Sequence, residues 1–178
     1  MKLSLKSIAA LFALVAAPIV LGAGSASAQP FGVQGERFDR SYVGAGVGAG
    51  LTNGGRDNDA AILGGNVQGR FAVPNAPVSV RGSVLFTNKN SAVIPTVTYD
   101  LPVSKTTNVY AGAGYSFVQK DNQSSQIGNK DAAVLTAGVE SQVAKGVVVY
   151  SDAKYGINAY EGSNAGALTV QAGVGLQF

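Results

Sequence analysis

The sequence contains no cysteine and no histidine among its 178 residues. Without cysteine, disulfide bonds, cysteine-ligated metals and a cysteine nucleophile are excluded, which suits a protein exported unfolded into an oxidising compartment. Without histidine, the most common general base, serine–histidine triads and most zinc sites are excluded together. The two absences argue against an enzyme, and we expect no catalytic residue, no metal site and no cofactor.

Charged residues are also scarce, at 13% of the chain, whereas hydrophobic residues make up 46% and glycine occurs 24 times. A hydrophobic content this high argues for a folded chain rather than a disordered one. The length suits a single domain.

The N-terminus has the pattern of a secretory signal peptide. Lys2 and Lys6 precede an apolar stretch at 8–21, and a small-residue site at 26–28 predicts cleavage between Ala28 and Gln29. An uncleaved membrane helix is the alternative, but Pro18 and the short apolar core favour cleavage. We expect a signal peptide over residues 1–28 and a short periplasmic leader over residues 29–40.

Removal of the signal peptide lowers the net charge from +3 to +1, because two lysines leave with it. The excess of basic residues is therefore largely a property of the signal. No nucleic acid partner is expected for the remaining chain.

The final stretch, 168–178, alternates between two kinds of residue. One parity is apolar and ends on the terminal Phe178, whereas the other carries only threonine, glutamine and glycine. A period of two over about ten residues predicts a strand with one apolar face.

The same alternation, separated by turn signals, continues through the chain without a helical period. It predicts eight strands of roughly ten residues, at 41–51, 60–71, 78–87, 92–101, 107–118, 132–143, 147–157 and 168–178. Short turns after the second, fourth and sixth strands alternate with mostly longer loops, as in outer-membrane barrels. We predict an all-β fold, an eight-stranded antiparallel up-and-down transmembrane β-barrel over residues 41–178.

Alternation alone does not decide which face points inward, and a soluble barrel with an apolar interior is the alternative. Two features favour an apolar face toward lipid. The charged residues share a face with most of the glycines, which suits a narrow filled lumen. The aromatic residues of the apolar face fall at the strand ends, as interfacial girdles do, namely Phe71, Tyr99 and Phe178 at one end and Phe86, Tyr115, Phe117 and Tyr155 at the other.

With its signal peptide, eight strands and C-terminal pattern, the chain resembles the small outer-membrane β-barrel family, similar to the membrane domain of OmpA and to OmpX. The C-terminal pattern is a polar residue, a glycine, a large apolar residue and a terminal aromatic, here Gln171, Gly173, Leu176 and Phe178. The resemblance implies that these residues form the assembly signal read by the barrel-insertion machinery. It also implies a bacterial outer-membrane location, outer-membrane lipid as surroundings, and a monomer.

The inward face carries the residues that could take part in binding or catalysis, which are an ionic cluster and three tyrosines. The predicted lumen residues are Arg70, Arg81, Asp100, Glu140, Asp152 and Lys154, with the aromatics Tyr42, Tyr110 and Tyr150. In an eight-stranded cylinder the second and sixth strands are opposite, as are the third and seventh. We therefore expect Arg70 and Arg81 to face Glu140 and Asp152 at similar depth, because unpaired buried charges are costly.

Three further features of the sequence concern local structure and a possible binding motif. The run 44–49 fits a dinucleotide-binding glycine pattern, but it lies within a predicted strand rather than before a helix. The polar run 119–131 is expected to be a solvated loop, and Pro95 inside the fourth strand is expected to cause a bulge.

The function expected from these features is a non-catalytic, structural role in envelope integrity. One alternative is a narrow, low-conductance porin for small solutes, in which the ionic cluster is a gate and glycine-rich walls above it leave room for water. A second alternative is a surface adhesin that acts through the outer loops. Asp152 and Glu140 could in principle act as an acid/base pair, but the nearby arginines favour their being held ionised.

Overall fold

The computed structural model describes residues 38, 40–52, 62–119 and 123–178. The predicted signal peptide, the cleavage site at Ala28 and Gln29, and most of the leader lie outside this part of the chain. Within the described residues, no helix is long and apolar enough to cross a membrane.

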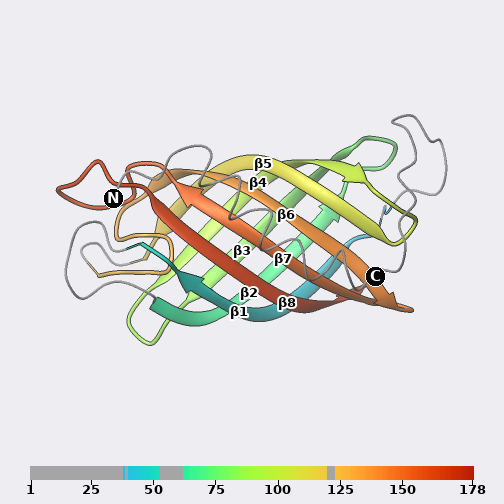
Figure 1. The fold of residues 1–178 in the computed structure, drawn as a ribbon, viewed down its shortest axis with the longest axis horizontal. Helices are drawn as coiled ribbons and strands as arrows, with labels where there is room; N and C mark the ends of the chain where they lie inside the picture. Colours follow the sequence, from blue (N-terminus) through green and yellow to red (C-terminus); the bar gives the residue numbers. More distant parts are fainter. Residues whose placement is uncertain (1–37, 39, 53–61, 120–122) are drawn as a thin grey trace.

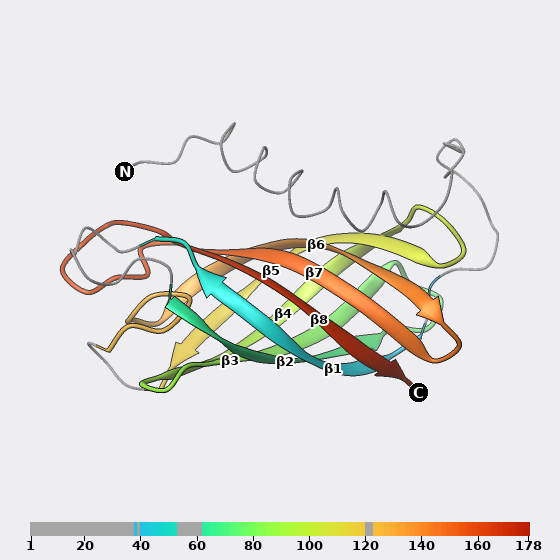
Figure 2. The ribbon, with the colours of Figure 1, turned by 60° about the horizontal axis from the view of Figure 1, so that its bottom comes forward.

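Eight antiparallel strands form a closed barrel in sequence order, which confirms the predicted fold class (Figures 1 and 2). The strands are β1 Tyr42–Gly50, β2 Ile62–Ala72, β3 Val78–Phe86, β4 Ser91–Pro102, β5 Thr107–Val118, β6 Ala132–Ala144, β7 Val147–Gly156 and β8 Ala167–Gln177. Closure leaves no unpaired edge strand, as a membrane-spanning sheet requires.

The chain closes by pairing its first and last strands. Opposite residues include Gly44 with Gly175 and Gly46 with Gly173, so the inward glycines of the two strands lie side by side as the alternation predicts. The backbone amide of Phe178 continues the ladder and donates to the carbonyl of Ser41 (3.1 Å).

The barrel has an apolar outside and a polar inside. Large hydrophobic side chains of the outward parity are exposed on every strand except β7, with Leu63 at 76% and Val47 at 71%. Inward polar side chains such as Asn66, Thr98 and Glu140 are buried. This inverted distribution is that of a barrel in lipid, and it excludes the soluble barrel with an apolar core.

The aromatic residues mark the two ends of the barrel. We call the end with the turns after β2, β4 and β6 the turn end, and the opposite one the loop end. Phe71, Tyr99 and Phe178 are exposed toward the turn end, whereas Phe86, Tyr115 and Phe117 are exposed toward the loop end. Two aromatic levels on the outer surface fit the two membrane interfaces.

The expected bulge at Pro95 is wrong. Among the described residues the β4–β5 ladder is interrupted at Ile94 and Pro95, but its register is the same on both sides, with Val93 opposite Phe117 and Thr96 opposite Gly114. The strand therefore tolerates the missing amide without inserting a residue. A register shift occurs instead in the β6–β7 pair, between Gln142 and Ala144 beside the tight turn.

Candidate functional site

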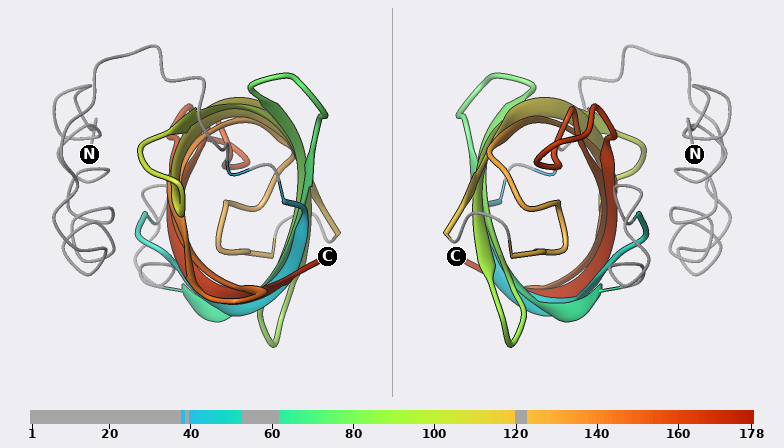
Figure 3. Two further views of the ribbon diagram at one scale, coloured as in Figure 1. Left: turned by 90° about the vertical axis from the view of Figure 1, so that its right-hand side faces the viewer. Right: turned by 90° about the vertical axis from the view of Figure 1, so that its left-hand side faces the viewer.

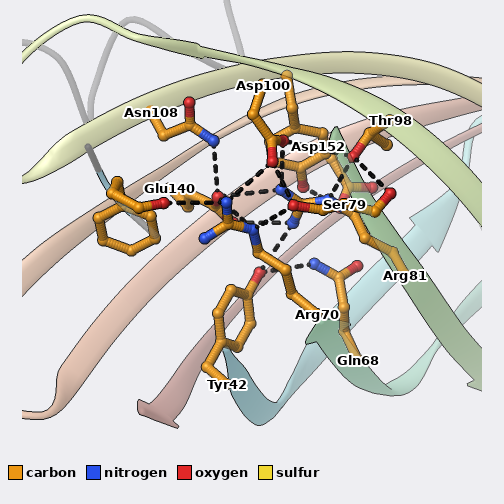
Figure 4. A network of polar contacts seen from close by, with 12 residues as sticks. Tyr42, Gln68, Arg70, Ser79, Arg81, Thr98, Asp100, Asn108, Glu140 and Asp152 are labelled. Atoms are coloured by element: carbon orange, nitrogen blue, oxygen red, sulfur yellow. Dashed lines mark hydrogen bonds and ion pairs between the residues drawn. The ribbon is translucent and has the colours of Figure 1, made fainter. Parts of the chain in front are cut away.

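The centre of the barrel toward the turn end is filled by charged side chains from β2, β3, β4, β6 and β7, most of which are labelled in Figure 4. All six side chains of the predicted ionic cluster point inward and are at most 5% exposed, the most exposed being Asp100. Three are basic and three are acidic, so the cluster is electrically neutral when all are ionised. We call these residues the lumen network: Arg70, Arg81, Asp100, Glu140, Asp152 and Lys154.

Arg81 on β3 lies at the middle of the network. Its guanidinium forms two hydrogen bonds to Glu140 on β6, Nη1 to Oε2 at 2.8 Å and Nη2 to Oε1 at 2.9 Å. Nη2 also donates to Oδ1 of Asp100 at 3.1 Å, and Nε donates to the Thr98 hydroxyl at 3.0 Å. The guanidinium lies 3.6 Å from the ring centroid of Tyr110. One arginine therefore ties together β3, β4, β5 and β6.

Arg70 on β2 connects the network to the segment that precedes the barrel. Its Nη2 donates to Oδ2 of Asp100 at 2.9 Å, and its Nε lies 3.3 Å from Oε1 of Glu140. Nη2 also donates to the backbone carbonyl of Phe38 (3.0 Å), and Nη1 donates to that of Arg40 (2.9 Å). The Arg70 guanidinium also lies 5.1 Å from the Phe38 ring centroid.

Phe38 consequently belongs to the barrel interior. Its side chain is buried in a cluster with Tyr42, Val148 and Tyr150 at the turn end. A short leader was expected over residues 29–40, and of these the structure describes Phe38 and Arg40. Residues 29–40 have no periodic pattern, and nothing in them marks one aromatic as an inward plug.

Asp152 does not pair with the arginines, contrary to the expectation from opposite strands. Its Oδ1 accepts from Nζ of Lys154 at 2.9 Å, two residues further along the same strand. Its Oδ2 accepts from the Tyr110 hydroxyl at 2.9 Å. Tyr110 lies between Asp152 and Arg81, because its ring contacts the guanidinium and its hydroxyl contacts the carboxylate. Asp100 takes the place in the arginine pairs that Asp152 was expected to hold.

Neutral side chains complete the hydrogen bonding around the charges. The Tyr42 hydroxyl accepts from Gln68 (3.0 Å) and from Nη1 of Arg81 (3.3 Å). Asn108 donates to Oε1 of Glu140 at 2.8 Å, and the Ser79 hydroxyl donates to Oδ2 of Asp100. The two arginines and the three carboxylates therefore have several partners each, as the burial of ionised groups demands.

The tip of the β5–β6 loop folds into the other half of the barrel, at the loop end (Figure 3). Ser125, Gln126, Ile127 and Asn129 are buried, so the expectation of a wholly solvated loop is wrong. Nε2 of Gln126 donates to the carbonyls of Gly65 and Phe86, each at 3.2 Å. We call residues 125–129 the loop plug.

Apolar side chains of the inner wall pack against the loop plug. Ile127 packs with inward-facing side chains of β3, β4, β5 and β6, namely Leu85, Ala92, Ile94, Val118 and Val134. The expectation of glycine-rich walls with room for water above the ionic cluster is therefore wrong for this side of the barrel. The apolar residues share the parity of Arg81, Thr96, Ser116 and Thr136, so the inward face changes from polar to apolar toward the loop end.

The chemistry open to this arrangement is limited. Glu140 and Asp152 have cationic partners at 2.8–2.9 Å, and both are 0% exposed. Within the described residues, no group of three or more acidic side chains could hold a metal ion. The glycine pattern at 44–49 lies inside the strand β1, whereas the pattern that binds a dinucleotide phosphate lies at a turn from a strand into a helix.

The four residues of the C-terminal pattern divide between the two faces of β8. Leu176 and Phe178 face outward, at 64% and 71% exposure. Gln171 faces inward, where its Nε2 donates to Gln68 (2.7 Å) and to Asp152 (2.9 Å). Gly173 lies under the Tyr150 side chain, since a Cβ there would be 2.4 Å from the tyrosine hydroxyl.

Comparisons with known proteins agree with this architecture. A family model for the outer membrane protein β-barrel domain matches residues 15–178. The fold is similar to that of Ail, the attachment invasion locus protein of Yersinia pestis, with 18% identity, a TM-score of 0.52, and coverage of 79% of this chain and 99% of that chain.

Two structures from Pseudomonas aeruginosa are also similar. The outer membrane protein OprG has 8% identity and a TM-score of 0.55, with coverage of 83% of this chain and 99% of OprG. The N-terminal β-barrel domain of OprF has 14% identity and a TM-score of 0.53, with coverage of 82% and 100%. No curated protein matches the chain. At such identities the solved structures establish a shared fold.

Proposed function

The chain belongs to the outer membrane protein β-barrel domain family, and we propose that it is a non-catalytic structural protein of the envelope, with a closed lumen. It lies in the bacterial outer membrane. The observation that carries the proposal is the lumen network, in which three cations and three carboxylates fill the barrel interior with their charges paired.

Two segments add to the closure of the lumen. Phe38 is buried at the turn end against Tyr42 and Tyr150, and the loop plug occupies the loop end. A solute path along the barrel axis would have to displace both segments and also separate buried ion pairs. Separating one such pair costs several kcal/mol. This arrangement supports a sealed barrel over the low-conductance porin.

The absence of catalysis is proposed on the same geometry. Acid/base work needs a carboxylate that can gain and lose a proton beside a substrate. Glu140 accepts from Arg81 and Asn108, and Asp152 accepts from Lys154, Tyr110 and Gln171. Both carboxylates are also 0% exposed, so a substrate atom has no access to either of them.

We assign the turn end to the periplasm and the loop end to the cell exterior, since barrels of this class have short periplasmic turns and longer outer loops. The exposed apolar band contacts outer-membrane lipid, and the barrel acts as a monomer. The C-terminal pattern is read by the barrel-assembly machinery during insertion. The adhesin alternative is less favoured, because residues 125–129 of the longest loop are buried and cannot contact a partner.

Planar-bilayer recording of the refolded protein tests closure. The wild type is expected to give no steady conductance, whereas the double variant Arg70→Ala with Arg81→Ala is expected to admit small ions because it removes two of the three lumen cations. Steady single-channel currents from the wild type would establish the porin alternative and overturn the closed lumen.

The envelope role has its own test in cells. A strain without the protein is expected to become more sensitive to detergent, and the wild-type gene is expected to restore resistance. Unchanged detergent sensitivity in the deletion strain would refute the structural role. If such a strain instead lost attachment to a host surface, the adhesin alternative would replace it.

A further inference from the structure

A row of four residues crosses the place where the barrel closes. Tyr150 on β7 is opposite Gly173 on β8, Gly173 is opposite Gly46 on β1, and Gly46 is opposite Asn66 on β2. The hydroxyl of Tyr150 donates to Oδ1 of Asn66 at 2.6 Å, and both side chains are buried. The bond therefore joins β7 directly to β2 and passes over both strands of the closing pair.

Two glycines next to the Tyr150 ring make the bond possible, Gly173 in this row and Gly44 beside it. A Cβ on Gly173 would lie 2.4 Å from the Tyr150 hydroxyl, and a Cβ on neighbouring Gly44 would lie 2.8 Å from Cε1 of the same ring. Real Cβ atoms do not approach other atoms so closely, so any side chain at these positions would push the ring away. The glycines of β1 and β8 thus leave space for the Tyr150 ring next to their backbone.

A second bond crosses the same boundary. Nε2 of Gln171 on β8 donates to Oε1 of Gln68 on β2 at 2.7 Å, again passing over β1. Gln68 also donates to the Tyr42 hydroxyl at 3.0 Å, and the rings of Tyr42 and Tyr150 stack with their centroids 5.8 Å apart. The side-chain bonds that pass over β1 thus come from both β7 and β8, and both end on β2.

The β1–β8 boundary is where closure is hardest, because it pairs residues 42–50 with residues 169–177. Bringing such distant segments together has a higher entropic cost of loop closure than pairing neighbouring strands in a hairpin. Interactions that exist only in the closed barrel can offset this entropic cost.

We propose that Asn66, Gln68, Tyr150 and Gln171 form a seam latch, a set of side-chain bonds that holds β1 against β8 from inside the barrel. Opening the boundary requires rupture of the latch bonds as well as the backbone ladder. The seam latch holds two strands together, whereas the lumen network closes the lumen. The latch therefore operates whether or not the lumen conducts.

Hydrogen exchange of the refolded barrel tests the latch, with Tyr150→Phe as the variant. It removes only the hydroxyl and keeps the ring. We expect backbone amides of β1 and β8, such as those of Ala45 and Val174, to exchange about fivefold faster, which is the effect of one net hydrogen bond on a local opening equilibrium. Tyr110→Phe is the matched control. It removes a buried inward hydroxyl that donates to Asp152 without crossing the boundary, and it should leave exchange in β1 unchanged.

Two further experiments distinguish an effect on the latch from a general loss of stability. Asn66→Ala and Tyr150→Phe are expected to be non-additive in a double-mutant cycle, since each removes the same bond. A disulfide between Val43→Cys and Leu176→Cys, which are opposite one another on the outer face, should abolish the effect of Tyr150→Phe. Equal acceleration in all strands, full additivity, or an undiminished effect in the cross-linked barrel would each overturn the proposal. Bilayer conductance is a separate readout, so failure of the latch and failure of the closed lumen are distinguishable.

Discussion

Arg81 on β3 and Glu140 on β6 form a bidentate ion pair across the barrel interior, with nitrogen–oxygen distances of 2.8 and 2.9 Å. Neither side chain is exposed beyond 2%. A bidentate arginine–carboxylate pair fixes orientation as well as charge, so this pair sets the distance between β3 and β6, two strands that are not neighbours in the sheet. Its rupture is expected to affect the whole barrel rather than one strand.

The first prediction concerns the charge of Glu140. Glu140→Gln leaves the Arg81 and Arg70 guanidiniums sharing Asp100 as their acidic partner, and loss of one member of a buried pair costs about 3 kcal/mol. We expect the free energy of unfolding in urea to fall by about that amount. The matched control is Glu161→Gln, at an exposed loop position, for which a change below about 0.5 kcal/mol is expected. Equal effects of the two variants would contradict the central position of this pair.

The second prediction separates the charge of Arg70 from its geometry. Arg70→Lys keeps the positive charge, but a single ammonium cannot reach Asp100, Ser79 and the carbonyls of Phe38 and Arg40 together. We expect a loss of about 2 kcal/mol in stability and faster proteolysis on the N-terminal side of Ser41. Arg40→Lys is the control, since the carbonyl of Arg40, which it retains, is the group that Arg70 contacts. Unchanged proteolysis in Arg70→Lys would show that Arg70 does not hold this segment.

The third prediction concerns the loop plug. Ile127 is fully buried among apolar side chains, so Ile127→Ala is expected to lower the free energy of unfolding by about 2–4 kcal/mol. Val143→Ala removes a similar side chain from the outer surface, where Val143 is 60% exposed, and should have a much smaller effect. The measurement is urea unfolding followed by the mobility shift of the folded barrel on gels. A negligible effect of Ile127→Ala would mean that the loop tip does not stay in the barrel.

Backbone topology and the direction of side chains followed from alternation alone. In a strand, parity fixes the face, so the inward positions of Arg70, Glu140 and Tyr150 were predictable once the strands were placed. The pairing of the last strand with the first followed from closure, and it predicted that Gly173 would lie beside glycines of β1.

The identity of the partners inside the lumen was not predictable in the same way. Partner choice depends on the stagger of the strands and on side-chain length, which parity does not contain. Asp152 therefore pairs with Lys154 on its own strand. The burial of Phe38 and Ile127 was missed because a single apolar residue in a polar segment has no period. The in-register Pro95 shows that a missing donor need not produce a bulge.

The fourth prediction concerns Phe178, which the C-terminal pattern marks as part of an assembly signal. In the folded barrel its ring is 71% exposed and meets Phe71 edge to face, with centroids 6.1 Å apart. An aromatic pair of this kind contributes about 1 kcal/mol, so Phe178→Ala should weaken the finished barrel only slightly. If the residue is read during insertion, the same variant should be inserted much more slowly by the barrel-assembly machinery in reconstituted vesicles.

Phe117→Ala is the matched control for this prediction. Phe117 is 51% exposed and pairs with Tyr115 at 5.1 Å, but it lies on β5, far from the C-terminal strand. Both variants should lose similar stability in urea, because each removes one ring from an exposed aromatic pair at a membrane interface. Only Phe178→Ala should slow machinery-dependent insertion. If the two variants were inserted at the same rate, Phe178 would be an interfacial aromatic like any other, and its position at the end of β8 would carry no signal.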